Sequence, residues 1–270
     1  METVEHGFVE IEGASIYYEL SGTGPTIVLL HGFSFDMTVW DDQMEALTES
    51  YRVLRYDLRG FGRSTAGDVA YTHAGDLKAL LDHFSISNPC LAGLSLGGGA
   101  VINFALMYPD YARAIILVAP SLGGFKWSER TASTQSSLQA RVREKGIDAT
   151  RELWLRQVIF RHSMNNKLVA ARLRTMVSRY SGWHWLHADL GRPITPPAIE
   201  RLSDIQIPTL ILVGDADAPD QLQIADTLEQ GIRSSKKIVF PGVGHLVNME
   251  EPRLFNERVL EFLRSVKPKA

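Results

Sequence analysis

One turn carries the strongest signal in this chain: Leu91-Ala92-Gly93-Leu94-Ser95-Leu96-Gly97-Gly98-Gly99. An apolar run over residues 89–94 predicts a short buried strand, and a helical pattern over 96–107 follows at once. A strand that turns directly into a helix strains the residue between them, and Gly93 and Gly97 remove side chains that would clash there. Ser95 would then stand at a helix N-terminus, where backbone N–H groups favour developing negative charge. The pattern G-x-S-x-G predicts a nucleophile elbow, although a plain glycine-rich connection has the same letters.

Strands and helices alternate on both sides of this turn. Two short runs at 8–11 and 16–20 predict an antiparallel hairpin. Apolar runs like that at 89–94 also predict strands at 26–30, 52–56, 113–119, 209–213 and 237–240. With helical patterns between them, the sequence predicts an α/β fold: a mostly parallel eight-stranded sheet flanked by helices.

Residues 121–192 follow the sixth predicted strand and show no strand pattern. They contain several amphipathic helical stretches and four of the five tryptophans. We therefore predict a core domain made of residues 1–120 and 193–270, interrupted by a helical insertion at 121–192.

The composition excludes several classes of protein. The 270 residues are 45% hydrophobic and 22% charged with a net charge of −3, which is typical of a globular protein and unlike a nucleic-acid-binding one. The one cysteine, Cys90, allows no internal disulfide. Residues 1–6 show no signal-peptide pattern, and no run of about 18 apolar residues predicts a membrane span. We expect a cytoplasmic protein that binds neither nucleic acid nor membrane, with a homodimer as a possible state.

A serine nucleophile needs a base within reach and a third group that orients the base. His245 follows the strand at 237–240 through a glycine-containing loop, at the sheet edge where Ser95 is expected. The orienting acid is expected after the strand at 209–213, where Asp217 is preferred and Asp215 is the alternative. A solvated loop histidine and an aspartate that only caps the next helix are the plainer interpretations.

Two backbone N–H groups must hold the oxyanion that such chemistry creates. Leu96, directly after the nucleophile, and Phe33, in the loop after the strand at 26–30, are expected to supply them. Gly32 is expected to contact the substrate, and His31 to hold this loop by side-chain hydrogen bonds. No metal or nucleotide cofactor is predicted, because the chain has no H-E-x-x-H, no phosphate loop and no G-x-G-x-x-G after the first parallel strand.

These motifs resemble the α/β-hydrolase family over nearly the whole chain. The matching stretches are His31-Gly32-Phe33, Asp57-Leu58-Arg59-Gly60-Phe61-Gly62-Arg63-Ser64, Gly93-Leu94-Ser95-Leu96-Gly97-Gly98, Gly214-Asp215-Ala216-Asp217 and Gly242-Val243-Gly244-His245. The resemblance implies a Ser-His-Asp triad whose acid is Asp217, the last residue of the Gly-x-x-Asp tetrad. It also implies that residues 121–192 form a helical cap, or lid, over the site.

Serine at the elbow argues against a haloalkane dehalogenase, where aspartate would be expected. Residues 40–99 are similar to 3-oxoadipate enol-lactonases, although the His-Gly pair in the oxyanion loop departs from that subgroup. The Gly-Pro-Gly-Ala loop typical of meta-cleavage-product hydrolases is also missing.

The cap is basic, with thirteen Lys and Arg against five Asp and Glu in residues 121–192. This charge either attracts an acidic substrate or is an ordinary solvated surface. Trp183 and Arg179 are expected to bind substrate, although Trp183 and Trp185 could equally join the cap to the core.

The sequence thus predicts a serine hydrolase, without a cofactor, that cleaves a small-molecule carboxylic ester or lactone through an acyl-enzyme. Two alternatives stay open. The same triad could hydrolyse a carbon–carbon bond of a diketone, or the fold could serve as a non-catalytic ligand receptor.

Overall fold

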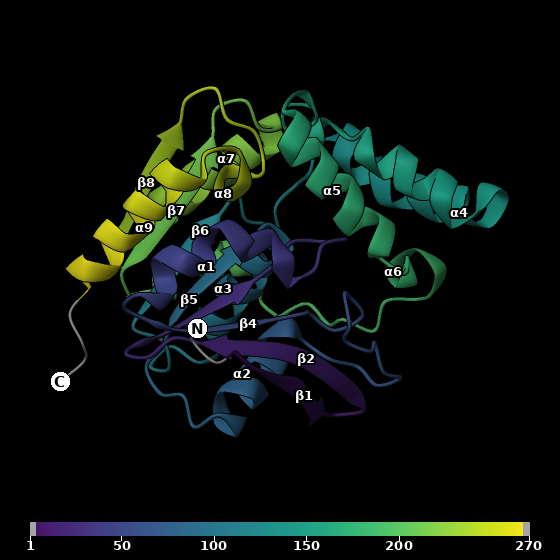
Figure 1. The fold of residues 1–270 in the computed structure, drawn as a ribbon. Coiled ribbons are helices and arrows are strands. Elements are labelled where there is room, and N and C mark those ends of the chain that lie inside the picture. The colour runs from purple at the N-terminus through teal and green to yellow at the C-terminus, as the bar shows by residue number, and fades with distance from the viewer. Residues whose placement is uncertain (1–3, 267–270) are drawn as a thin grey trace.

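The computed structural model describes residues 4–266, apart from the side chain of Gln135. Its strands form one sheet in the order β1-β2-β4-β3-β5-β6-β7-β8 (Figure 1). The strands are β1 (Glu5–Ile11), β2 (Ala14–Ser21), β3 (Thr26–Leu30), β4 (Arg52–Tyr56), β5 (Cys90–Leu94), β6 (Ala114–Val118), β7 (Thr209–Gly214) and β8 (Ser235–Phe240). β2 pairs antiparallel with β1 and β4, and the other neighbours pair parallel. The predicted eight-stranded, mostly parallel α/β sheet is therefore confirmed.

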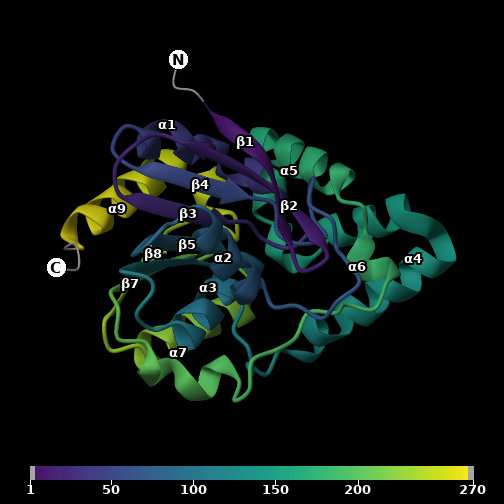
Figure 2. The same cartoon turned by 90° about the horizontal axis from the view of Figure 1, so that it is seen from below.

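Helices cover both faces of the sheet (Figure 2). They are α1 (Asp41–Thr48), α2 (His73–His83), α3 (Leu96–Met107), α4 (Glu129–Leu155), α5 (Lys167–Arg179), α6 (Trp183–Leu186), α7 (Pro219–Gly231), α8 (Val247–Glu250) and α9 (Pro252–Ser265). Short 3-10 turns lie at Met37–Trp40, Val158–Phe160, Ser163–Asn165 and Ala198–Asp204. None of the helices in the described part of the chain is long and apolar enough to cross a bilayer. Residues 1–3 and 267–270 of the predicted core domain lie outside the described residues. Residues 1–6, where the sequence shows no signal-peptide pattern, are therefore described only from residue 4 onward.

Two apolar cores, one on each face, hold the layers together. In β3, Val28 and Leu30 belong to the core that α2, α3 and α7 cover, while Ile27 and Leu29 belong to the core under α1, α8 and α9. Successive side chains of a strand point to opposite faces, so a sheet covered on both sides needs strands that are apolar throughout. This is why the parallel strands are continuous apolar runs in the sequence.

The turn from β5 into α3 is packed too closely for side chains. A Cβ on Gly93 would lie 2.3 Å from the carbonyl oxygen of Gly97, and a Cβ on Gly97 would lie 2.4 Å from that of Leu30. A Cβ on Gly98 would lie 2.6 Å from the Cβ of Pro120. The glycines therefore let α3 begin directly behind Ser95 and against the ends of β3 and β6.

The chain between β6 and β7 is helical, as predicted. α4, α5 and α6 lie together to one side of the sheet (Figure 1). α4 bends at Gly146, whose φ is 80°. The division into a core domain and a cap at 121–192 stays a prediction.

Substitution of Gly97 tests the close approach at the elbow. We expect Gly97→Ala to lower the free energy of unfolding by about 1–3 kcal/mol, because the new Cβ must displace backbone. Gly123→Ala is the control, since a Cβ there would meet its nearest atom only at 3.7 Å. Urea unfolding at 25 °C measures both, and equal stability of the two variants would contradict the expectation.

Candidate active site

Ser95 occupies a strained position between β5 and α3. Its backbone has φ 52° and ψ −112°, a region that non-glycine residues rarely adopt. Its N–H donates to the carbonyl of Val118 at 2.9 Å, and its own carbonyl accepts from Gly99 and Ser121. These bonds hold the half-buried Ser95 at the N-terminus of α3, where the helix dipole favours negative charge.

The loop after β3 lies against Ser95. A Cβ added to Gly32 would be 3.3 Å from the Cβ of Ser95, so the peptide between Gly32 and Phe33 is next to the hydroxyl. Within the described residues, the N–H groups of Phe33 and Leu96 donate to no protein acceptor. Two free donors beside a serine are what an oxyanion hole requires.

His31 holds this loop through hydrogen bonds of both ring nitrogens. Its Nε2 accepts from the N–H of Leu58 at 2.9 Å, so Nδ1 carries the proton and donates to the carbonyl of Gly32 at 2.8 Å. The ring is fully buried, and burial lowers the pKa of His31 to about 4. His31 is therefore neutral at pH 7, and both of its nitrogens are used for structure.

The structure brings His245 and Asp217 together at the ends of β8 and β7. Nδ1 of His245 donates to Oδ2 of Asp217 at 2.8 Å, and both side chains are buried. Oδ1 of Asp217 accepts from the N–H of Ala218 at 2.6 Å. With Nδ1 bound to the carboxylate, Nε2 is the nitrogen left for a proton from a substrate or nucleophile.

Asp215 has a different partner. Its Oδ1 accepts from the N–H of Gly242 at 2.7 Å, which holds the loop that leads to His245.

Between residues 4 and 266 no hydrogen bond joins the Ser95 hydroxyl to His245. Such bonds are often long before substrate binds.

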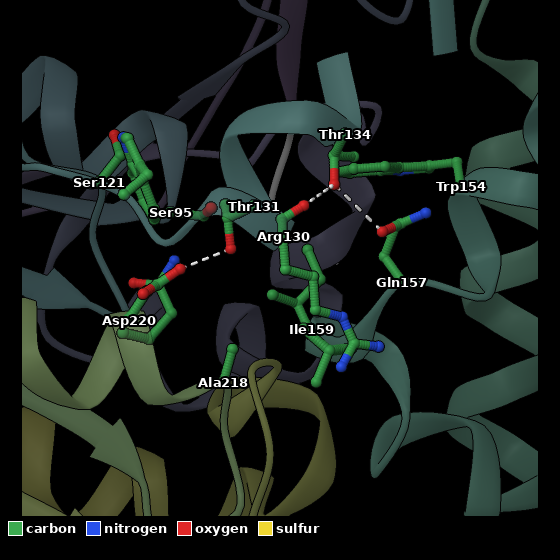
Figure 3. A pocket seen from close by; sticks show the side chains of 13 residues that line it. Ser95, Ser121, Arg130, Thr131, Thr134, Trp154, Gln157, Ile159, Ala218 and Asp220 are labelled. Carbon is green, nitrogen blue, oxygen red and sulfur yellow. Dashed lines mark hydrogen bonds between the residues drawn. The ribbon is translucent and has the colours of Figure 1, made fainter. Parts of the chain in front are cut away.

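A cavity of about 200 Å³ opens beside Ser95 (Figure 3). Most of its wall comes from the segment between β6 and β7, and the opposite wall comes from the start of α7. It is lined by Ser95, Ser121, Trp127, Arg130, Thr131, Thr134, Trp154, Gln157, Val158, Ile159, Ala218, Asp220 and Gln221. Two indole rings and three aliphatic side chains make it largely apolar, as sites for small molecules usually are.

One carboxylate in the cavity wall ties α4 to α7. Asp220 accepts from the hydroxyls of Ser128 and Thr131, the latter bond being visible in Figure 3. Burial acts to raise the pKa of Asp220, but these hydrogen bonds outweigh it and lower the pKa below its ordinary value. Asp220 is thus an anion satisfied by the first turn of α4.

The two predicted substrate contacts near the end of the predicted cap lie elsewhere. Trp183 stacks on His187 with ring centroids 5.2 Å apart, and a guanidinium nitrogen of Arg179 lies 3.8 Å from Oδ2 of Asp36. Neither residue lines the cavity beside Ser95, and Arg179 borders a separate hollow with Arg63. Trp127 and Trp154 line the cavity instead, and nothing local in the sequence distinguishes them from the other tryptophans of residues 121–192.

The ring of Phe33 joins the loop after β3 to the segment between β6 and β7. It packs edge-on against Trp154 and Tyr180 at centroid distances of 5.5 and 5.6 Å, and it contacts Trp185 at 6.1 Å. Nε1 of Trp154 donates to the hydroxyl of Ser34 at 2.6 Å. Trp185 is buried in this cluster, so it contributes to packing between the loop after β3 and the segment between β6 and β7.

No metal centre accompanies the site: in the described part of the chain, no group of three His, Cys, Asp or Glu side chains could hold an ion. Known proteins resemble this chain along most of its length. Residues 27–258 match the sequence profile of the alpha/beta hydrolase family. The chain belongs to the alpha/beta hydrolase family.

Relatives of this alpha/beta hydrolase differ in the substrates that their names give. The structure of a thermophilic esterase from Thermogutta terrifontis is 29% identical, with a TM-score of 0.84 over 97% of this chain and 100% of that one. The 2-hydroxy-6-oxononadienedioate/2-hydroxy-6-oxononatrienedioate hydrolase of Burkholderia vietnamiensis is 28% identical, covering 92% of this chain and 91% of the relative. The pimeloyl-[acyl-carrier protein] methyl ester esterase of Vibrio atlanticus is 25% identical, covering 92% and 98%. The protein is accordingly a hydrolase.

The buried ring of His31 makes stability depend on pH. Its folded pKa of about 4 lies below the ordinary 6.5, so the unfolded chain binds the proton first and stability is lost as pH falls from 6.5 toward 4. We expect the free energy of unfolding of His31→Gln to fall less between pH 6.5 and pH 4 than that of the wild type, by up to about 3 kcal/mol. Urea unfolding at pH 7 and pH 5 measures the change, with His187→Gln at an exposed ring as control. A pH dependence unchanged in His31→Gln would contradict the assignment.

Proposed function

We propose that the protein is a serine hydrolase that cleaves a carboxylic ester or lactone, with Ser95, His245 and Asp217 as its catalytic triad. The observation that carries the proposal is the buried hydrogen bond of 2.8 Å between Nδ1 of His245 and Asp217. It fixes the tautomer that a general base needs, at the same sheet edge as a serine held in an elbow conformation.

The reaction follows from the groups around Ser95. Nε2 of His245 takes the hydroxyl proton as Oγ attacks the carbonyl carbon, and the N–H groups of Phe33 and Leu96 stabilise the oxyanion. Asp217 stabilises the imidazolium. The alcohol leaves with the proton from His245, and an acyl-enzyme remains. Water then gives its proton to His245 and attacks the ester carbon, releasing the acid and restoring Ser95.

The cavity supports a small acyl group of low polarity. Trp127, Trp154 and Ile159 offer apolar surface within the same cavity as Ser95, and Gly32 leaves room beside the nucleophile. The relatives named as esterases support an ester bond as the target. The cytoplasmic location, the homodimer and the binding roles of Trp183 and Arg179 remain predictions.

A second candidate is hydrolysis of a carbon–carbon bond in a diketone on the same triad. It is favoured by the relative from Burkholderia vietnamiensis, whose substrate name includes a 6-oxo group. A panel of esters, lactones and diketones separates the two, because turnover of diketones alone would replace the ester assignment.

Removal of the nucleophile tests the assignment directly. We expect Ser95→Ala to lower kcat on p-nitrophenyl butyrate by about 10⁶-fold, because no acyl-enzyme can form. The release of p-nitrophenolate measures turnover, and circular dichroism checks that the variant stays folded. Turnover that persists in folded Ser95→Ala would reject Ser95 as the nucleophile.

The two aspartates give a matched pair for the third member of the triad. Asp217→Asn should lower kcat by about 10⁴-fold, because an amide cannot hold the same tautomer of His245. Asp215→Asn should lower it far less, since Asp215 holds only the Gly242 N–H. Steady-state kinetics on the same ester decide, and the reverse order would transfer the role to Asp215.

A further inference from the structure

A second buried carboxylate lies one helical turn beyond His245. Glu250 ends α8, and its side chain is only 4% exposed. Its carboxylate accepts four hydrogen bonds: from the N–H of Gly244 at 2.7 Å, the N–H of Leu246 at 3.3 Å, the hydroxyl of Ser163 at 2.6 Å and Nδ1 of His162 at 2.6 Å. A carboxylate accepts bonds at both oxygens, so all four donors can be satisfied at once.

Two of these donors flank the proposed base. Gly244 and Leu246 are the immediate neighbours of His245, so Glu250 binds the backbone on both sides of that residue. The preceding part of the loop is held by Asp215, through the N–H of Gly242. Hydrogen bonds that backbone N–H groups donate to a carboxylate are stronger than those between neutral groups. The loop thus depends on two acids, and Glu250 holds the part that carries the imidazole.

The other two donors belong to the segment between β6 and β7. His162 and Ser163 lie at the 3-10 turn before α5, far from Glu250 in the sequence. This turn sits directly on the loop, because a Cβ added to Gly244 would be 2.7 Å from the Cβ of His162. One carboxylate therefore joins the cap turn and the histidine loop, and Gly244 allows their contact.

We propose that Glu250 is a positioning residue that holds His245 in place and makes its placement depend on the cap turn at His162 and Ser163. This rests on the proposed function, because it requires His245 to be the base. Glu250 does not line the cavity beside Ser95, and neither do Gly244 and Leu246. Its loss should therefore impair the chemical step more than substrate binding.

Two substitutions separate the hydrogen bonds of Glu250 to the His245 loop from its hydrogen bond to the cap turn. Glu250→Gln keeps the shape but replaces one accepting oxygen by a donor, which faces the backbone N–H groups of the loop. We expect kcat on p-nitrophenyl butyrate to fall by about 100-fold with KM nearly unchanged, as for small misplacements of a catalytic group. Ser163→Ala removes only a cap-side donor, and a smaller fall of kcat in the same direction is expected.

Hydrogen exchange gives a readout that is independent of activity. The amides of Gly244 and Leu246 should exchange faster in both variants than in the wild type, because their acceptor is lost or less well held. Glu229→Gln makes the same change of charge at an exposed carboxylate that pairs with Lys237, and it should alter neither kcat nor exchange. Leu263→Ala, in the core under α9, controls for a loss of stability alone.

The outcomes are separable. Wild-type kcat and wild-type exchange in Glu250→Gln would overturn the positioning role, and so would an equal loss of kcat in folded Leu263→Ala. Wild-type kcat in Ser163→Ala would overturn the dependence on the cap turn if the Gly244 and Leu246 amides also exchange as slowly as in the wild type. If the wild type cleaves no ester, lactone or diketone, the proposed function fails, and exchange still decides whether Glu250 holds the loop.

Discussion

The backbone of Ser95 is the constraint on which the site depends. A non-glycine residue at φ 52° stores about 1–3 kcal/mol of strain, and it persists only where the surroundings determine it. Here the surroundings are backbone: the carbonyl of Leu30 faces Gly97, and Val118 accepts the N–H of Ser95. Because adjoining strands and α3 set these contacts, the hydroxyl is placed by the sheet itself rather than by flexible side chains.

The loops at this edge of the sheet are held by buried side chains that bind backbone. Loops lack the hydrogen-bond ladders of strands, so their buried N–H and carbonyl groups need other partners. His31 binds the loop after β3, Asp217 and Asp215 bind the loops after β7 and β8, and Glu250 binds the residues around His245. Asp57 does the same for the N–H groups of Met37 and Arg63, and burial raises the pKa of its carboxyl to about 6.

The helices between β6 and β7 reach each part of the site. Aromatic rings of this segment pack on Phe33, Asp220 binds its first turn, and Glu250 binds its turn at Ser163. The basic side chains of this segment have different surroundings. Arg130 lines the cavity, while other arginines of this segment form ion pairs with carboxylates, Arg172 with Asp42 and Arg151 with Asp148. The segment therefore shapes the surroundings of Ser95 through packing and hydrogen bonds as well as through charge.

The sequence by itself determined the sheet, the elbow and the family. Continuous apolar runs and glycines at fixed spacing are local signals, and they predicted α3 at residues 96–107 as the structure has it. Only the tertiary structure decided which aspartate faces His245 and which tryptophans line the cavity. Asp215 and Asp217 are two residues apart in one loop, and Trp127 and Trp183 both belong to the one stretch without a strand pattern. Their roles follow from how distant segments pack, and Glu250 escaped the sequence interpretation because its four partners come from two segments about 80 residues apart.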